Sequence, residues 1–219
     1  MNVSWLGHSC FHILSSNGIS ILTDPYDKSV GYNMPKIRAD VVLISHDHSD
    51  HNCIKAVAGD FSVVRAPGVH QASGIEFLGV ATYHDEQVGA RRGKNTVYCF
   101  RVDGIRICHL GDLGHLLEQK EIQEIGEVDL LFVPVGGIYT IDAIGADRVI
   151  AQLRPRMVIP MHYRTKALRF PLDSVSKFLK GRDYQGPFNS LNIAASDLVV
   201  ESDLGKMESR AILLDYISG

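Results

Sequence analysis

Residues 45–52 read SHDHSDHN and place three histidines and two aspartates within six positions. The apolar run VVLI at residues 41–44 precedes them and has the character of a buried strand. Ionisable groups at the end of a buried strand cost free energy unless a partner such as a cation satisfies them. The stretch therefore predicts a metal site rather than a solvated polar turn.

The spacing of these side chains suits two neighbouring metal ions. His46 and His48 are two residues apart, so their side chains point the same way if the chain stays extended. Asp50 and His51 follow where the chain begins to turn, and Asn52 can cap a helix over residues 52–58, so this pair can face a second point. Imidazole and carboxylate ligands without a thiolate favour Zn2+ and leave Mn2+ and Fe2+ open.

The composition of the 219 residues is that of one globular domain, 1–219, with 45% hydrophobic and 21% charged residues. The net charge of −3 and the lack of a polybasic run disfavour nucleic-acid binding. Four cysteines occur without a C-x-x-C pair, which disfavours a cysteine zinc site. No basic N-terminal segment precedes an apolar one, and no apolar run approaches the roughly 18 residues of a membrane span. We therefore expect a cytoplasmic protein that does not associate with membranes.

The hydrophobic pattern predicts many short strands and fewer helices. Asp103-Gly104 lies between two alternating runs and predicts a hairpin over residues 95–112. Two buried-type strands at 128–137 and 154–163 flank a helical pattern, which predicts a β-α-β unit. Further strands are expected at 3–7, 10–14, 19–25, 39–46, 61–67, 75–84 and in the tail 192–219, and further helices at 117–126, 142–153 and 171–181. The pattern predicts a layered α/β sandwich in which helices cover the sheets.

Six motifs in a fixed order carry a resemblance to a known family. They are WLGHSCFHI at 5–13, TDP at 23–25, HDHSDH at 46–51, HLGD at 109–112, PVGGIYTID at 134–142 and PMHY at 160–163. With them the chain resembles the metallo-β-lactamase-fold hydrolases. It is most similar to the branch of L-ascorbate-6-phosphate lactonase-like proteins and N-acylphosphatidylethanolamine phospholipase D. This resemblance implies a four-layer αβ/βα sandwich of two mixed β-sheets covered by helices, with a dinuclear metal site at one edge.

The resemblance also implies a set of metal ligands. One metal would be held by His46, His48 and His84, and the second by Asp50, His51 and His162, with Asp112 as the bridge. Each of these residues follows a predicted strand, where catalytic residues usually lie. The context of His84 is loosely patterned, and His70 in PGVHQ is the alternative third ligand of the first metal; we prefer His84.

Other polar residues in the motifs are candidates for catalysis and positioning. We predict catalytic roles for Asp50, which could orient the nucleophile or carry its proton, for His8, and for His109 as proton donor or substrate contact. For His109 a buried, hydrogen-bonded structural role is the alternative. Asp24 in TDP could fix the tautomer of a ligand imidazole by accepting its second N–H.

Basic residues beside the predicted ligands could bind an anionic substrate. Arg91 and Arg92 lie in the loop after His84, and Arg164 follows His162 by two residues. Guanidinium groups match phosphate and carboxylate well, although arginines in loops are often merely solvated. Arg164 is the preferred candidate because it is nearest in sequence to a predicted ligand.

A dinuclear site of this kind predicts hydrolysis, because it supplies a metal-bridging hydroxide at neutral pH. We expect a hydrolase, with two Zn2+, of an ester, lactone or phosphoester bond in a small anionic metabolite. A phosphodiesterase or nuclease on the same site and a non-catalytic metal-binding protein are the alternatives. Neither a substrate-gripping insertion nor a broad basic patch supports a nuclease. The sequence leaves open the natural substrate, the general acid and the oligomeric state, and it is compatible with a homo-oligomer.

Overall fold

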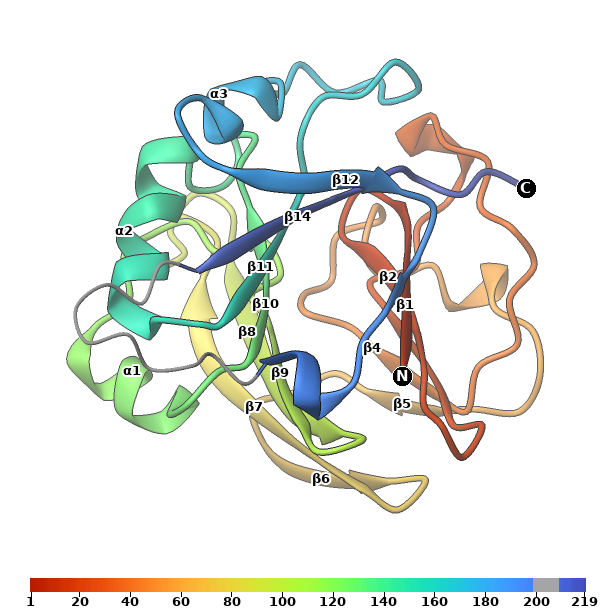
Figure 1. Ribbon diagram of the computed structural model, residues 1–219. Coiled ribbons are helices and arrows are strands. Elements are labelled where there is room, and N and C mark those ends of the chain that lie inside the picture. The colour runs from red at the N-terminus through yellow and green to blue at the C-terminus, as the bar shows by residue number, and fades with distance from the viewer. Residues whose placement is uncertain (199–208) are drawn as a thin grey trace.

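The computed structural model describes residues 1–198 and 209–219 and shows two mixed β-sheets packed face to face (Figure 1). The six-stranded sheet has the order β13-β1-β2-β3-β4-β5, and the eight-stranded sheet has the order β12-β14-β11-β10-β9-β8-β7-β6. The strands of the first sheet are β1 (Asn2–Gly7), β2 (Cys10–Leu14), β3 (Ser20–Thr23), β4 (Val41–Leu43), β5 (Ser62–Val64) and β13 (Leu191–Asn192). Those of the second are β6 (Gly68–Ala72), β7 (Ile75–Tyr83), β8 (Lys94–Val102), β9 (Ile105–His109), β10 (Leu130–Pro134), β11 (Met157–Met161), β12 (Tyr184–Phe188) and β14 (Arg210–Leu214).

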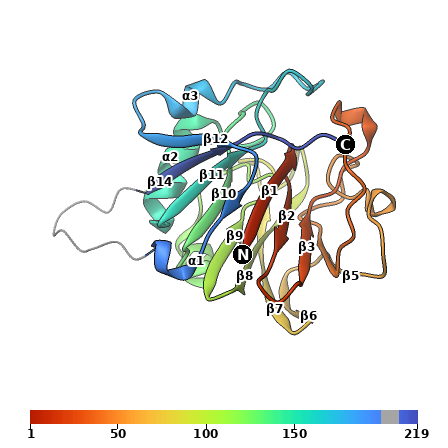
Figure 2. The ribbon, with the colours of Figure 1, turned by 45° about the vertical axis from the view of Figure 1, so that its right-hand side comes forward.

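Helices flank this pair of sheets, as the sequence predicted. Figures 1 and 2 show α1 (Gln119–Ile125), α2 (Ala143–Leu153) and α3 (Ser176–Leu179) on the side of the eight-stranded sheet. The loops outside the six-stranded sheet carry two short 3-10 turns, η1 (Lys28–Val30) and η2 (Ile54–Ala56), and a third turn, η3 (Ala195–Leu198), precedes the end of the first described range. None of the helices in the described ranges is long and apolar enough to cross a membrane.

The β-α-β prediction is confirmed. β10 and β11 are parallel neighbours, and α2 connects them. Asp142 caps α2 by accepting a hydrogen bond from the Gly145 N–H at 2.8 Å. The helix buries one face against the core, at the i, i+3, i+4 and i+7 positions Ala146, Val149, Ile150 and Leu153.

The hairpin prediction is confirmed as well. β8 and β9 pair in antiparallel fashion with Val102 opposite Ile105, which leaves Asp103 and Gly104 as the two turn residues. Both have positive φ, 49° and 81°, as the tight turn that matches strand twist requires. β9 runs from this turn to His109, so residues 109–112 lie at the opposite edge of the sandwich, where the site is built.

Two predicted helices are much shorter than expected. The helix over 52–58 is reduced to η2, because Cys53 provides no side-chain cap and Asn52 donates its side-chain N–H to Asp47 instead. The helix over 171–181 is reduced to α3, and Val175, the N-cap residue just before it, likewise makes no side-chain cap. In the tail, strands form at β13 and β14, and the part of that prediction at 199–208 lies outside the described residues.

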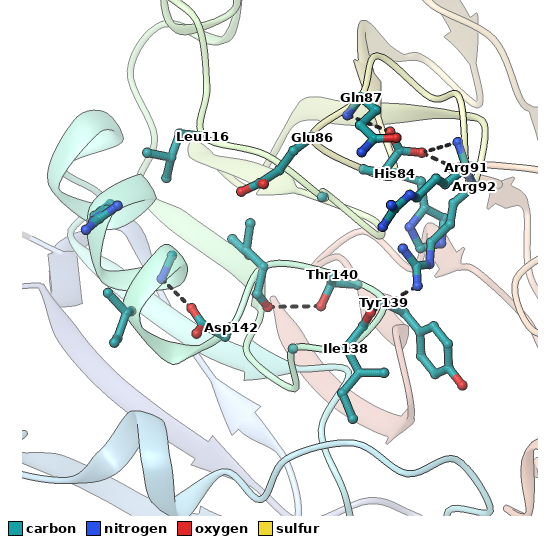
Figure 3. Close-up of a pocket in the computed structure, with 17 residues that line it drawn as sticks. His84, Glu86, Gln87, Arg91, Arg92, Leu116, Ile138, Tyr139, Thr140 and Asp142 are labelled. Atoms are coloured by element: carbon teal, nitrogen blue, oxygen red, sulfur yellow. Dashed lines mark hydrogen bonds between the residues drawn. The ribbon is translucent and has the colours of Figure 1, made fainter.

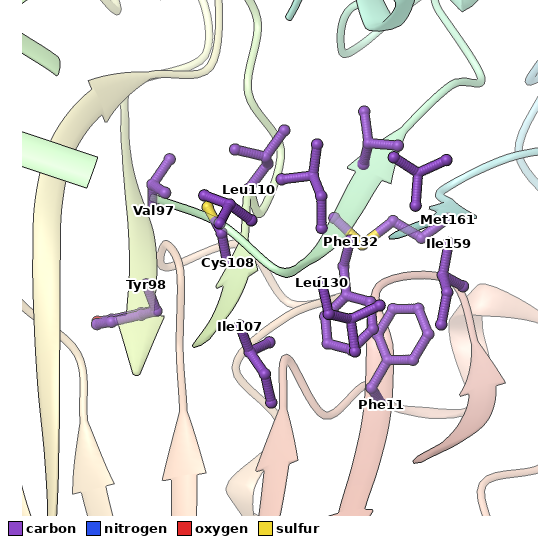
Figure 4. Close-up of a cluster of buried hydrophobic side chains, with 14 of the residues drawn as sticks. Phe11, Val97, Tyr98, Ile107, Cys108, Leu110, Leu130, Phe132, Ile159 and Met161 are labelled. Atoms are coloured by element: carbon purple, nitrogen blue, oxygen red, sulfur yellow. The ribbon is translucent and has the colours of Figure 1, made fainter. Parts of the chain in front are cut away.

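The main hydrophobic core lies between the two sheets. Phe11 of β2 stacks on Phe132 of β10, with ring centroids 4.0 Å apart and planes 8° from parallel (Figure 4). In β4, Val41 and Leu43 face this core, whereas Val42 faces a second cluster on the other side of the six-stranded sheet. Burial on both faces explains why the strand before the histidine cluster is apolar throughout. It also holds the end of β4 rigidly at the edge of the sandwich.

Candidate metal centre

The predicted ligands come together because each follows the end of a strand at the same edge of the sandwich. β3, β4 and β5 run parallel in one sheet, and β9, β10 and β11 run parallel in the other, so their carboxyl ends face one way. The site residues directly beyond strands are His8 after β1, Asp24 after β3, His46 shortly after β4, His84 after β7, Asp112 after β9 and His162 after β11. Residues more than a hundred positions apart thus face a common point.

Asp112 lies at the centre of this cluster. Its Oδ2 atom is 3.1 Å from Nε2 of His84, 3.2 Å from Nε2 of His162 and 3.3 Å from Nε2 of His51. The more distant Nε2 of His46 lies 4.0 Å away. Imidazoles from both predicted ligand sets therefore surround one carboxylate oxygen, as a bridging role would require.

The donor atoms fall into groups that could each hold a metal ion. His46, His48 and His84 form one group, which is the predicted first ligand set. A second group contains the predicted Asp50, His51 and His162 together with His8, and a third combination is His46, His51 and Asp112. Within each group the donor atoms lie within 4.8 Å of one another. His8, for which we predicted a catalytic role, therefore lies among the potential ligands.

The chemistry of the cluster fits a metal. Nε2 of His46 and Nε2 of His51 are buried without a hydrogen-bond partner among the described residues. A buried polar atom left without a partner costs about 1 to 3 kcal/mol, so two such atoms in one cluster call for a cation. Nitrogen and carboxylate donors without thiolate are a usual set for zinc and related transition metals.

Asp24 lies behind the ligands and is fully buried. Its Oδ1 accepts a hydrogen bond from the Ser45 N–H at 2.7 Å, and its Oδ2 accepts from Ser45 Oγ at 2.8 Å and His109 Nε2 at 2.9 Å. Burial alone would raise the pKa of this carboxyl, but the hydrogen bonds and charges of His109 and His51 bring it well below its usual range. Asp24 is therefore a charged, fully engaged acceptor.

Through Ser45, Asp24 also reaches the first ligand set. Ser45 Oγ donates to Asp24 and lies 2.8 Å from Nδ1 of His46. A hydroxyl that donates to a carboxylate can accept the Nδ1–H of the imidazole, which leaves Nε2 of His46 as the free lone pair. The predicted positioning role of Asp24 thus has a geometric basis on both sides of the site.

His51 lies between two carboxylates, those of Asp24 and Asp112. Burial lowers its pKa, but Asp112 and Asp24 outweigh that effect and raise the pKa well above its usual value. The same contacts lower the pKa of Asp112, which burial alone would raise. In the metal-free protein a proton on His51 therefore supplies positive charge between the two carboxylates.

His8 contacts the cluster through Asp50. Its Nε2 lies within hydrogen-bond distance of Asp50 Oδ2, at 3.1 Å, and its ring packs 4.2 Å from that of His162, measured between centroids. Burial, followed by repulsion from His162, lowers the pKa of His8 to about 4. Burial raises the pKa of Asp50, but His8 and His51 bring it below its usual range.

The backbone is strained at three of these positions. His8, Asp24 and His162 have φ values of 54°, 38° and 52°, in the left-handed region that residues other than glycine seldom occupy. Such conformations cost about 1 to 3 kcal/mol each and concentrate at functional sites. They turn each side chain back toward the cluster directly after its strand.

A cavity of about 300 Å3 opens onto the cluster, and we refer to it as the metal cavity. Its lining residues are His48, Asp50, His84, Arg92, Asp112, Tyr139, His162 and Phe170. Sequence reasoning missed Tyr139 and Phe170; Tyr139 lies within the quoted motif PVGGIYTID, whereas no local pattern marks Phe170.

The structure separates the three arginines proposed for substrate binding. Arg92 lines the metal cavity, and Arg91 and Arg92 both line the pocket beside it (Figure 3). Arg164, the candidate preferred from sequence, lines neither. The backbone N–H of Arg164 donates to Asp173 O, and the Arg164 side chain is exposed at the surface. A role for Arg164 in substrate binding stays a prediction that these two spaces do not support.

The structure also shows where the histidines of the two remaining alternatives lie. His84 joins the cluster, whereas His70, the alternative, lies in β6 with its Nε2 2.8 Å from Ala66 O. His109 is fully buried with its Nε2 on Asp24, and it lines neither the metal cavity nor the pocket beside it. This buried, hydrogen-bonded position is the one that the structural alternative for His109 requires.

Comparisons with known proteins agree with this geometry. Residues 2–162 match the β-lactamase superfamily domain. A metal-dependent hydrolase of Thermococcus onnurineus is 28% identical over 193 residues, which cover 75% of this chain and 85% of the relative. A Pyrococcus abyssi protein is 30% identical over 182 residues, covering 75% and 84%.

A solved structure extends the likeness over the whole chain. It is a provisionally assigned zinc-dependent hydrolase of the metallo-β-lactamase superfamily from Thermotoga maritima, with 38% identity, a TM-score of 0.79 and 99% of each chain covered. The domain match and this structure agree with the sandwich. The chain therefore belongs to the metallo-β-lactamase superfamily and is one of its metal-dependent hydrolases.

Proposed function

We propose that this enzyme binds two zinc ions and hydrolyses an ester, lactone or phosphoester bond of a small anionic metabolite. His46, His48 and His84 would hold one ion, and Asp50, His51 and His162 the other, with Asp112 between them. The observation that carries the proposal is the position of Asp112 Oδ2, 3.1 to 3.3 Å from three imidazole nitrogens that belong to both sets. The Thermotoga relative supports zinc, with Mn2+ or Fe2+ as alternatives.

Metal ions bound there would lower the pKa of water and polarise the bond under attack. The chain itself supplies Asp50 as the residue best placed to orient the attacking water and carry its proton, because Asp50 lines the metal cavity. His8 holds that carboxylate in place through the 3.1 Å contact and is sheltered from solvent. Asp50 therefore acts on the substrate side, and His8 acts through Asp50.

The size and charge of the cavity support the substrate class. About 300 Å3 accommodates a small metabolite rather than a polynucleotide, which argues against the nuclease alternative. Arg92 provides a cation in the wall, and a guanidinium suits a phosphate or carboxylate. The resemblance to the ascorbate-6-phosphate lactonase-like branch supports a lactone or phosphoester.

Four free cysteines, three of them buried, suit a reducing compartment such as the cytoplasm. Homo-oligomer formation stays a prediction.

Metal analysis and turnover test this proposal together. We expect two metal ions per chain after reconstitution with zinc, and hydrolysis in a panel of lactones, phosphodiesters and phosphorylated sugars that chelation abolishes. His48→Ala and Asp112→Asn should each abolish turnover, whereas His70→Gln, outside the cluster, should retain it. His48 is exposed, so its loss should not disturb folding.

Each outcome has a defined meaning. Absence of stoichiometric metal would contradict the dinuclear site. Turnover of bis(p-nitrophenyl) phosphate without any lactone hydrolysis would move the assignment to a phosphodiesterase. Failure of the fully metal-loaded protein across the panel would favour the non-catalytic metal-binding alternative.

A further inference from the structure

A second pocket of about 490 Å3 adjoins the metal cavity, and we refer to it as the outer pocket (Figure 3). It lies between the loop of residues 85–92 and the segment 137–145 that leads into α2, with Arg148 of α2 in its wall. His84, Arg92 and Tyr139 line both spaces, so the two are contiguous at these residues. A molecule with its reactive bond at the metal cluster can therefore extend into the outer pocket.

We propose that the outer pocket binds an anionic group of the substrate, a phosphate or a carboxylate, that is separate from the bond cleaved at the metal cluster. This inference rests on the proposed hydrolase function and defines the substrate further, as a molecule with an anionic end and a scissile end. Arg91, Arg92 and Arg148 supply the positive charge.

The three arginines are available to a ligand. None of them has a carboxylate within 4.0 Å among residues 1–198 and 209–219, whereas Arg156 and Arg182 elsewhere are paired with aspartates. Arg92 is held in position, since its Nη2 donates to Ile138 O at 3.1 Å and its Cζ lies 5.3 Å from the centre of the Tyr139 ring. The other N–H groups of this guanidinium remain for an anion at the junction of the two spaces.

The carboxylates in the same walls are mostly engaged by backbone N–H groups. Asp85 is buried, and it accepts hydrogen bonds at 2.7 to 3.0 Å from the N–H groups of Gln87, Gly89, Arg91 and Arg92. Asp142 accepts from the Gly145 N–H at the start of α2. Oriented N–H dipoles offset a negative charge, so the fields of these two carboxylates at the pocket are weakened.

Asp85 also shapes the loop that carries two of the arginines. Its four hydrogen bonds close the loop over residues 85–92, and the Gly93 N–H to Gly89 O bond of 2.9 Å completes it. This conformation brings Arg92 across to the segment at Ile138 and Tyr139. Glu86, which is exposed, makes no hydrogen bond or ion pair with a described side chain, and it is the remaining free negative charge in the wall.

A matched pair of esters tests the inference in the zinc-loaded, full-length enzyme. p-Nitrophenyl butyrate is neutral, and mono-p-nitrophenyl glutarate carries a carboxylate at the far end of a similar acyl chain. A third ester with a terminal phosphonate distinguishes the two anions. We expect the charged esters to be preferred in kcat/KM. In Arg148→Ala their KM should rise about 10- to 100-fold relative to that of the neutral ester, with little change in kcat, because a charge-assisted hydrogen bond is lost.

Two further variants distinguish binding of the anion in the outer pocket from the effect of the protein's overall charge. Glu86→Gln removes the opposing charge and should strengthen the preference for the charged esters. Lys166→Ala removes a positive charge from an exposed position that lines neither space, and it should leave the preference unchanged. Equal kcat/KM for charged and neutral esters, or an unchanged preference in Arg148→Ala, would overturn the inference while hydrolysis itself stands.

Direct binding keeps the inference testable if no ester is turned over. Calorimetric titration of the zinc-loaded protein with inorganic phosphate should give a Kd about 10-fold or more weaker in Arg148→Ala than in wild type or Lys166→Ala. Equal affinities in all three proteins would refute the outer pocket as an anion site. Failure of ester hydrolysis alone would count only against the proposed function.

Discussion

The Asp24 carboxylate oxygen Oδ2 lies 3.2 Å from Nδ1 of His51, on the side of the ring opposite Nε2, which faces Asp112 at 3.3 Å. A proton shared between Asp24 and Nδ1 leaves the lone pair of Nε2 directed at the centre of the cluster. Ser45 Oγ donates to the same carboxylate and contacts Nδ1 of His46. One buried aspartate therefore orients an imidazole in each predicted ligand set, directly for His51 and through Ser45 for His46.

Replacing Asp24 should therefore weaken metal binding at both positions. We expect Asp24→Asn to lower zinc affinity about 10- to 100-fold, the usual effect of removing a residue that orients a ligand histidine. Ser45→Ala should weaken mainly the ion held by His46, since the contact of Asp24 with His51 survives. Competition titrations with a chromogenic chelator, which resolve the two dissociation constants, would measure this. Wild-type affinities in Asp24→Asn would contradict the orienting role.

The glycine before Asp112 should not tolerate a side chain. Gly111 has a φ of +55°, and a Cβ there would lie 2.5 Å from both Asn95 Oδ1 and Ser45 Cβ. Asn95 Oδ1 accepts the Asp112 N–H at 3.0 Å, so the clash falls on a contact that positions Asp112. We expect Gly111→Ala to lower the free energy of unfolding by about 2 to 4 kcal/mol, from strain plus overpacking, and to weaken zinc binding.

Gly74→Ala is the matched control for backbone strain. Gly74 also has positive φ, +75°, but nothing lies within 4 Å of its added Cβ. Its cost should be about 1 kcal/mol, without an effect on zinc affinity. Urea denaturation of both variants would measure the difference, and equal losses would show that the clash at Gly111 is relieved.

The stacked pair between the sheets should contribute strongly to stability. Phe132 is fully buried against Phe11, so Phe132→Ala should reduce the free energy of unfolding by about 3 to 5 kcal/mol. Phe188, which is 40% exposed in β12, provides the comparison, and its change to alanine should cost less than about 1 kcal/mol. A loss below about 1 kcal/mol for Phe132→Ala would mean that the two sheets repack around the cavity.

The metal-free protein should lose stability as the pH falls from about 6.5 to about 4. Burial lowers the pKa of His8 to about 4, whereas an unfolded chain has a histidine pKa of about 6.5. Between these values the unfolded state binds more protons, so the free energy of unfolding falls with the pH. His8 alone contributes on the order of 2 to 3 kcal/mol. The lowered pKa of His46, about 3, acts in the same direction, and burial is again its main cause.

Urea denaturation in chelator at several pH values would measure this slope. His8→Gln should reduce the slope between pH 6.5 and 4. Because the pKa of His51 is raised, the stability that His51 contributes is present below pH 6.5 and is lost as the pH rises through its folded pKa. Equal slopes in wild type and His8→Gln would show that other groups control the loss at low pH.

Local patterns were sufficient for much of the fold. The Asp103-Gly104 turn, the β-α-β unit around α2 and the buried strand before the histidine cluster follow from turn chemistry and hydrophobic periodicity, which act over a few residues. The helix predicted over 52–58 is wrong because the local signal for it, a side-chain cap, is missing. Without a side-chain cap a short segment forms only a single 3-10 turn, and packing outside the six-stranded sheet holds it as η2.

The candidate site was predictable where a motif carried the residues and unpredictable where contacts between distant segments decided them. His8 and Asp50 are 42 residues apart, and no local pattern indicates that their side chains meet. Arg148 lies on an exposed face of α2, where an arginine is ordinary, and only the packing of α2 beside the loop of residues 85–92 gives it a pocket.

Local chemistry is enough to predict that SHDHSDHN follows a buried strand and needs a cation, because ionisable groups cannot be placed there without one at an acceptable free energy. The packing of distant segments selects the groups that complete the cluster and the spaces beside it. It places His8 with Asp50, sets His109 behind Asp24, and puts Arg92 rather than Arg164 in the wall of the metal cavity. Sheet packing sets which strand ends meet, and the backbone conformation beyond each strand sets where its side chain points.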